Sequence, residues 1–174
     1  MHYTFTPLES WTERLYNHLS ISTPEQLNMI DIAAKLQIWL HFADIESTAM
    51  DREGLYSLII DRRLSKQQWE DFGHELCHLL RHAGNQMMLP DLMVELQESQ
   101  ANNFALHFCI PTFMLLKRPI PCLKREFIED ICTTFNVTYS FAEKRIEHFE
   151  NQVMHFRFTE QINRLYLQQS LVGN

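Results

Sequence analysis

The stretch QQWEDFGHELCHLLRHAG, residues 67–84, constrains the fold of this 174-residue chain more than any other segment. A capping box over residues 65–68 predicts that a helix begins here, and Gly84 predicts its end. At about 100° per residue, one side of this helix gathers large apolar side chains, and His74 and His78 lie on the other side. The apolar set is Trp69, Phe72, Leu76, Leu79 and Leu80.

His74 to His78 reads His-Glu-Leu-Cys-His. Imidazoles at i and i+4 lie about 6 Å apart along one helical face, so both can reach a zinc ion at about 2.0–2.1 Å. Glu75 then lies beside the ion as a general base. A solvated polar face is the alternative interpretation. His82 lies about 12 Å beyond His74, too far to share the ion, and is expected at the surface or behind the ligands.

Catalytic zinc usually has three protein ligands, so another donor is needed. In LQESQANNFALHFCIP, Glu98 falls within an apolar helical arc with Ala101 and Ala105, whereas Glu95 falls at the edge of that arc. A carboxylate in apolar surroundings needs a partner, and zinc would provide one. Asn102, one turn later, is placed to hydrogen-bond a ligand histidine. The sequence therefore predicts His74, His78 and Glu98 as metal ligands, supported by Asn102.

The remaining pattern predicts an α+β fold, mostly helical, as a single unit with a small antiparallel sheet. Expected strands cover residues 37–44 and 54–61, with a turn or short strand between them. The strand around residues 55–60 is a candidate to pair with an extended substrate. Helices are expected at residues 7–19, 24–36, 67–84 and 91–109, followed by a helix-turn-helix pattern at 123–150.

Composition narrows the function classes. The net charge of −7 comes without a basic cluster, which argues against direct nucleic-acid binding. The chain lacks a signal-peptide pattern and an apolar run long enough to span a bilayer, so a cytoplasmic protein is expected. The four cysteines form no Cys-x-x-Cys pair, so neither a zinc ribbon nor a disulfide framework is indicated.

Three segments together resemble the ImmA/IrrE family of zinc metallopeptidases, of phage or mobile-element type. They are YSLIIDRRLSKQQWEDFGHELCHLL, ESQANNFALHFCIP and FNVTYSFAEKRI, within about residues 50–150. The joint His-Glu-x-x-His and Glu-x-x-x-Asn pattern is typical of gluzincins, and Glu98 matches the third ligand position. The resemblance implies limited cleavage of a regulatory protein, commonly a helix-turn-helix transcriptional repressor.

Cys77 stands where that family usually has glycine. It is interpreted as a small helix residue at a tight contact, with a redox-sensitive thiol as the alternative. The pair of helices at 123–150 carries Glu143 and Glu147 beside Lys144 and Arg145, so a structural or protein-docking role is favoured over DNA binding.

These observations predict a zinc metalloendopeptidase in which residues 1–122 form the zincin-like domain and residues 123–174 a helical region packed on it. The expected partner is a protein substrate, a DNA-binding repressor, with no direct nucleic-acid or membrane contact. Two alternatives remain open. One is a non-catalytic zinc protein that sequesters a regulator, and the other is a transcription regulator that acts through residues 123–150.

Overall fold

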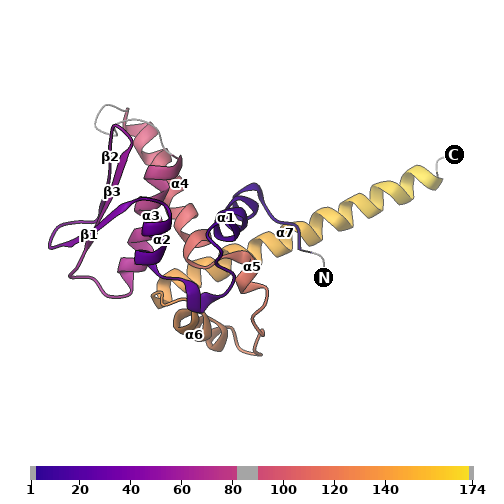
Figure 1. The fold of residues 1–174 in the computed structure, drawn as a ribbon. Coiled ribbons are helices and arrows are strands. Elements are labelled where there is room, and N and C mark those ends of the chain that lie inside the picture. The colour runs from indigo at the N-terminus through magenta and orange to yellow at the C-terminus, as the bar shows by residue number, and fades with distance from the viewer. Residues whose placement is uncertain (1–2, 82–89, 173–174) are drawn as a thin grey trace.

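The chain folds as a helical body with a small sheet at one end (Figure 1). The computed structural model describes residues 3–81 and 90–172, with side chains up to residue 163. It confirms the predicted α+β class. None of the helices within these ranges is long and apolar enough to cross a membrane. The proposed division of the chain at residue 122 stays a prediction.

The N-terminal segment contains shorter helices than predicted. Helix α1 (Pro7–His18) begins with a capping box, in which Thr6 and Glu9 each bond the other's backbone N–H. The expected helix at 24–36 is instead a 3₁₀ turn, η1 (Pro24–Gln26), followed by α2 (Met29–Lys35). Asn28 separates them because its side chain accepts bonds from the Ile30 and Asp31 N–H groups and so starts a new helix.

The sheet has three strands: β1 (Trp39–Ala43), β2 (Thr48–Arg52) and β3 (Leu55–Asp61). Their spatial order is β1-β3-β2, with β2 antiparallel and β1 parallel to β3. The sheet is therefore mixed, and the antiparallel prediction is right only for the β2–β3 hairpin. The turn uses Glu53 and Gly54 at φ 55° and 87°, the left-handed region that two-residue hairpin turns require.

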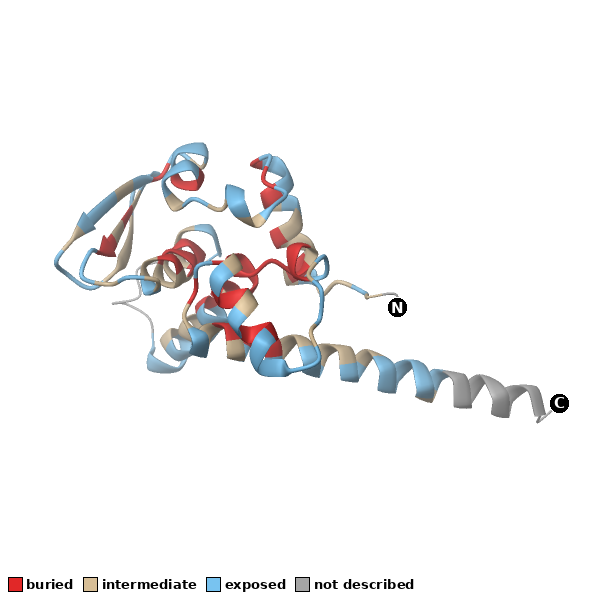
Figure 2. Cartoon of the chain, turned by 90° about the horizontal axis from the view of Figure 1, so that it is seen from below, coloured by how far each residue is buried: buried red, intermediate tan, exposed pale blue. Residues whose placement is uncertain are grey.

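Helices α3 (Gln67–Arg81) and α4 (Asp91–Cys109) pack against each other at the centre of the body. Figure 2 shows buried residues concentrated along their facing sides. The contact is close at Gly73, where an added Cβ would lie 2.8 Å from Cys109 Sγ. Trp69, Phe72 and Leu76 are buried as predicted, but Leu80 is 37% exposed. The predicted end of the α3 helix at Gly84 lies outside the described residues.

Three helices complete the chain: α5 (Thr112–Leu115), α6 (Lys124–Thr134) and α7 (Tyr139–Val172). The predicted turn between α6 and α7 is confirmed at Asn136, with φ 53°. The Glu70 carboxylate of α3 accepts the Thr138 N–H at 2.5 Å, which ties this turn to the body. Beyond its first turns, α7 extends away from the rest of the chain (Figures 1 and 2).

Candidate metal centre

The predicted histidine pair lies on the half-exposed side of α3. Trp69, Phe72 and Leu76 face the core, which directs His74 and His78 toward the side where α4 passes. One helical turn separates the two imidazoles, and their Nε2 atoms are 3.2 Å apart. The amphipathic pattern of α3 therefore positions both rings without any contribution from a loop.

Glu98 reaches the same point from α4. Its Oε2 lies 3.1 Å from His74 Nε2, and its Oε1 lies 3.5 Å from His78 Nε2. The three ligand atoms all lie within 4.8 Å of one another, and within the described ranges no other His, Cys, Asp and Glu cluster is placed to hold a metal. The residues that the sequence predicted as ligands are thus brought together.

The spacing of these atoms fits a tetrahedral metal ion. Ligands bonded to zinc at about 2.0–2.2 Å in tetrahedral geometry are about 3.3–3.6 Å apart. The His74–His78 separation of 3.2 Å and the His74–Glu98 Oε2 separation of 3.1 Å agree within a few tenths of an ångström, and the other Glu98 oxygen lies 3.5 Å from His78. Three protein donors also leave one tetrahedral position open, which is typical of catalytic rather than structural zinc.

Asn102 orients one of the rings. Its Oδ1 lies 3.2 Å from His74 Nδ1, and a carbonyl oxygen accepts a bond only from a protonated nitrogen. A neutral His74 therefore keeps the lone pair of Nε2, 3.1 Å from a carboxylate oxygen of Glu98. Two acceptors at this distance repel each other unless a cation lies between them. The donor set thus fits a metal ion, with Asn102 fixing the tautomer.

Glu75 lies next to the cluster on α3 but outside it. Burial raises the pKa of its carboxyl to about 7, and the charges of Glu98 and Asp71 act in the same direction. The Ala49 N–H opposes this rise by donating a hydrogen bond to the Glu75 carboxylate. Such a carboxyl is suited to exchange a proton near neutral pH.

The contact from Ala49 corrects the prediction about the substrate strand. Residues 55–60 belong to β3, which is the central strand and pairs with β1 on one side and β2 on the other. It has no free edge for another strand. The edge strand that meets α3 at Glu75 is β2, and its Ala49 N–H faces the carboxylate rather than β3.

Three further residues raised by the sequence have clear places. Cys77 is buried in the core, and burial raises the pKa of its thiol to about 12, which favours a packing role over a redox-sensitive one. Glu95 is exposed on α4 and lies outside the metal cluster. His82 lies outside the described residues.

The sequence did not indicate that β2 contacts Glu75 at the site. The segment STAMDREG was ambiguous between a turn and a strand, and a backbone N–H such as that of Ala49 leaves no residue-type signal. The close α3–α4 contact had one signal, the single glycine at position 73 within an otherwise strong helical pattern.

Comparison with known proteins agrees with this geometry. Residues 33–147 match the peptidase M78 family, described as IrrE N-terminal-like domain. The chain is 43% identical to the phage-like element PBSX protein XkdA of Bacillus subtilis (strain 168) over 156 residues, 89% of this chain and 79% of XkdA. It is 37% identical to "Uncharacterized protein YqaB" of the same strain over 163 residues, 93% of this chain and 95% of YqaB.

A solved structure, a Mycobacterium tuberculosis transcriptional regulator, aligns with a TM-score of 0.55 and 13% sequence identity. The alignment covers 79% of this chain and 46% of that one, so this chain spans less than half of the regulator's length. At this identity the likeness concerns the fold.

Fold and site thus define a protein of the metallopeptidase type, with a histidine pair and a glutamate on adjacent helices. The chain belongs to the IrrE N-terminal-like peptidase family, which confirms the resemblance to ImmA/IrrE proteins. The match to a protein of a phage-like element also agrees with the expected mobile-element type.

Proposed function

We propose that this protein is a zinc-dependent endopeptidase that makes limited cuts in a regulatory protein, a helix-turn-helix transcriptional repressor. The observation that carries the proposal is the convergence of His74, His78 and Glu98 on one point, with Glu75 beside it. A zinc ion held there would polarise the scissile carbonyl and make water a stronger acid.

The side chains around this point have separate roles in the proposal. His74, His78 and Glu98 hold the ion, and Asn102 keeps the His74 ring in the required tautomer. Glu75 takes a proton from the attacking water and then passes it to the leaving amine. Its burial beside the metal ligands keeps this carboxyl away from bulk water.

The substrate is proposed to bind along β2 as an additional strand. In an antiparallel pair, alternate residues direct their backbone groups away from the partner strand. Ala49 faces Glu75 in this way, so Asp51, two residues on, presents its backbone to the same side. An extended segment paired there would pass directly in front of Glu75 and the metal ligands.

The proposed substrate class rests on charge and on the family. A net charge of −7 favours contact with a basic partner, and repressors that bind DNA are basic on their DNA-binding face. XkdA belongs to a phage-like element. These features support a regulator encoded in a mobile element as the substrate.

The alternative of DNA binding through residues 123–150 has less support. Arg145 is fully buried, so its charge is not available to phosphate. Lys124 is paired with Glu150 and Arg125 with Glu129. The described α6–α7 helix pair therefore offers few free cations to a nucleic acid.

The test incubates the zinc-loaded protein with the repressor encoded beside its gene and follows cleavage by gel electrophoresis and mass spectrometry. We expect one or a few cuts, loss of cleavage with a chelator, and no comparable digestion of casein. Glu75→Gln should keep the metal and abolish cleavage, whereas Glu95→Gln, an exposed acid on α4, should cleave as the wild type does.

Two results would contradict the proposal. Cleavage by Glu75→Gln at the wild-type rate would remove Glu75 from the chemistry. Tight binding of the repressor by zinc-loaded protein without any cut would favour the alternative of a non-catalytic protein that sequesters its partner.

A further inference from the structure

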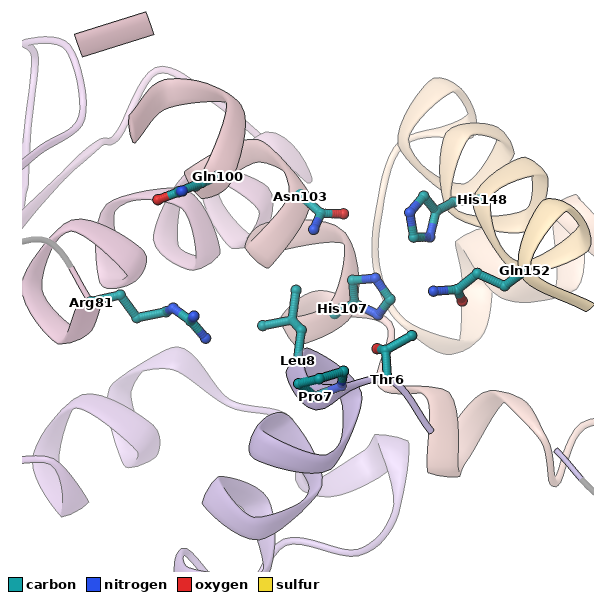
Figure 3. Close-up of a pocket in the computed structure, with 9 residues that line it drawn as sticks. All are labelled: Thr6, Pro7, Leu8, Arg81, Gln100, Asn103, His107, His148 and Gln152. Carbon is teal, nitrogen blue, oxygen red and sulfur yellow. The ribbon is translucent and has the colours of Figure 1, made fainter. Parts of the chain in front are cut away.

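A polar hollow lies where the N-terminal segment, α4 and α7 meet, and none of the metal ligands lines it. Its volume is about 410 Å3, and Figure 3 shows the side chains around it. Thr6 comes from the segment before α1, Asn103 and His107 from α4, and His148 and Gln152 from α7. Arg81, at the end of α3, also borders it.

The polar atoms around this hollow are incompletely satisfied. His107 is 1% exposed and Arg145 is fully buried. Among the described residues, His107 Nδ1, His148 Nδ1 and Arg145 Nη1 are buried without a hydrogen-bond partner. The two imidazole rings lie close together, with centroids 5.0 Å apart, and the charge of Arg145 acts on both. Buried nitrogens are almost always bonded, so three unsatisfied nitrogens in one place indicate a missing hydrogen-bonding partner.

The nearest carboxylate is already occupied. Glu9 Oε1 accepts hydrogen bonds from Tyr3 at 2.7 Å and from Thr112 at 2.6 Å, and Oε2 accepts the Thr6 N–H. Glu9 Oε1 is 3.9 Å from Arg145 Nη2 and 3.8 Å from His107 Nδ1, beyond hydrogen-bond distance for both. Within the described part of the chain, no aspartate or glutamate lines the hollow itself.

The polar groups around the hollow are mainly hydrogen-bond donors, and the Arg145 charge behind them lies 3.9 Å from the Glu9 carboxylate. The buried guanidinium of Arg145 lowers the pKa of both His107 and His148, in addition to the larger effect of burial. The side chains that line the hollow are rich in donors, namely two imidazoles, three amides and the guanidinium of Arg81. A bound oxyanion would accept hydrogen bonds from these groups.

We propose that the hollow between α4 and α7 is a binding site for a small molecule that carries a phosphate or carboxylate group, held by His107, His148 and the charge of Arg145. A volume of about 410 Å3 suits a ligand of metabolite size. Since α4 carries Glu98 on one side and His107 on another, such a ligand would contact the helix that supplies the third metal ligand. The site itself does not depend on the proposed peptidase activity.

The test measures binding of inorganic phosphate and of acetate to the zinc-loaded protein by calorimetry, with chloride at equal ionic strength as the reference. We expect about one phosphate or acetate per chain, with Kd about 1 mM or lower for the preferred anion. The histidine side-chain NMR signals of His107 and His148 should shift with the same saturation curve. Protein stripped of zinc should bind with the same affinity, because none of the metal ligands lines the hollow.

Matched variants on α7 provide the control. His148→Phe keeps a ring of similar size and should weaken binding at least 10-fold, whereas His155→Phe, an exposed histidine on the same helix, should not change it. Asn103→Ala, at an exposed position of the rim, should weaken binding without affecting folding.

Three results would overturn the proposal. The first is the absence of saturable binding of either anion, which would mean that water molecules bond the buried nitrogens. The second is binding that disappears when zinc is removed, which would place the anion on the metal. The third is equal affinity of His148→Phe and His155→Phe.

Discussion

Replacing Gly73 with alanine should destabilise the protein, although alanine is the better helix former. Gly73 lies in α3, one residue before His74, where α4 approaches most closely. The new Cβ would be 2.8 Å from Cys109 Sγ, 3.3 Å from Phe108 Cδ1 and 3.4 Å from the Ala105 Cα. An unstrained contact between such atoms is about 3.5–4.0 Å, so α4 or its side chains must move by up to about 1 Å.

Two opposing effects set the magnitude. Glycine to alanine within a helix contributes about 1 kcal/mol of stability, whereas overpacking a core costs about 1–3 kcal/mol. Cys109 cannot rotate away freely because its thiol donates a hydrogen bond to the Trp69 carbonyl at 3.2 Å. The cost therefore falls in the upper part of that range, and the free energy of unfolding should decrease by about 1–2 kcal/mol.

The assay is urea unfolding of the zinc-free protein, analysed as a double-mutant cycle with Cys109→Ala. Removing the sulfur relieves the closest contact, so the two substitutions should couple by at least about 1 kcal/mol. Gly73→Ala should also weaken zinc binding, because displaced α4 carries Glu98. A Gly73→Ala variant that is about 1 kcal/mol more stable than the wild type, or one whose cost is unchanged without the sulfur, would refute this reasoning.

Three further predictions concern the surroundings of the site. Glu70→Ala removes the acceptor of the Thr138 N–H and should lower the free energy of unfolding by about 1–2 kcal/mol. The control Glu147→Ala, at an exposed position of α7, should change it by less than about 0.5 kcal/mol in the same urea denaturation assay. His107 has a folded-state pKa of about 2 because of burial, Arg145 and His148, with Glu9 also nearby. Below pH 6.5 only the unfolded chain takes up this proton, so the free energy of unfolding should decrease as the pH is lowered. Between pH 7 and pH 5 the wild type should lose about 2 kcal/mol more than His107→Gln. Equal losses would exclude His107 as the cause. Asn102→Ala should lower zinc affinity about 10- to 100-fold in a chelator competition, and an unchanged affinity would remove Asn102 from the support of His74.

The convergence of the metal cluster could be predicted because helical periodicity fixes which residues share a face. His74 and His78 were assigned to one side of α3 and Glu98 to an arc of α4, and both assignments hold. The geometry of a metal ion then restricts how two such helices can meet. Periodicity and the motif favour Glu98 over Glu95, and Glu98 is the acid that lies beside both histidines, although its side chain is 41% exposed rather than buried in an apolar arc.

The order of the strands could not be read from the sequence in the same way. The alternation of side chains identifies a strand, but its neighbour in the sheet depends on where the connection leads. The loop after β1 carries the chain past the position of β3, so the β2–β3 hairpin places β3 in the centre. A strand that seemed available to a substrate is consequently paired on both sides.

The burial of Arg145 could also not be predicted from the sequence pattern. Its charge suggested a surface residue, and its partners Ile110 and Thr112 lie 35 and 33 residues away. Its Nη2 also lies 3.9 Å from Glu9 Oε1 of α1. Such a group forms only when three distant segments pack together, so no local sequence pattern predicts it.

The most direct test of the central claim is a zinc titration against a competing chelator for the wild type, Glu98→Ala and Glu95→Ala. Glu98 lies 3.1 and 3.5 Å from the two histidine nitrogens, whereas Glu95 is exposed and outside the cluster. The wild type should bind about one zinc per chain, Glu98→Ala should lose at least 10-fold in affinity, and Glu95→Ala should lose less than about 10-fold. Absence of zinc binding by the wild type, or a larger loss for Glu95→Ala than for Glu98→Ala, would contradict the assignment of this site.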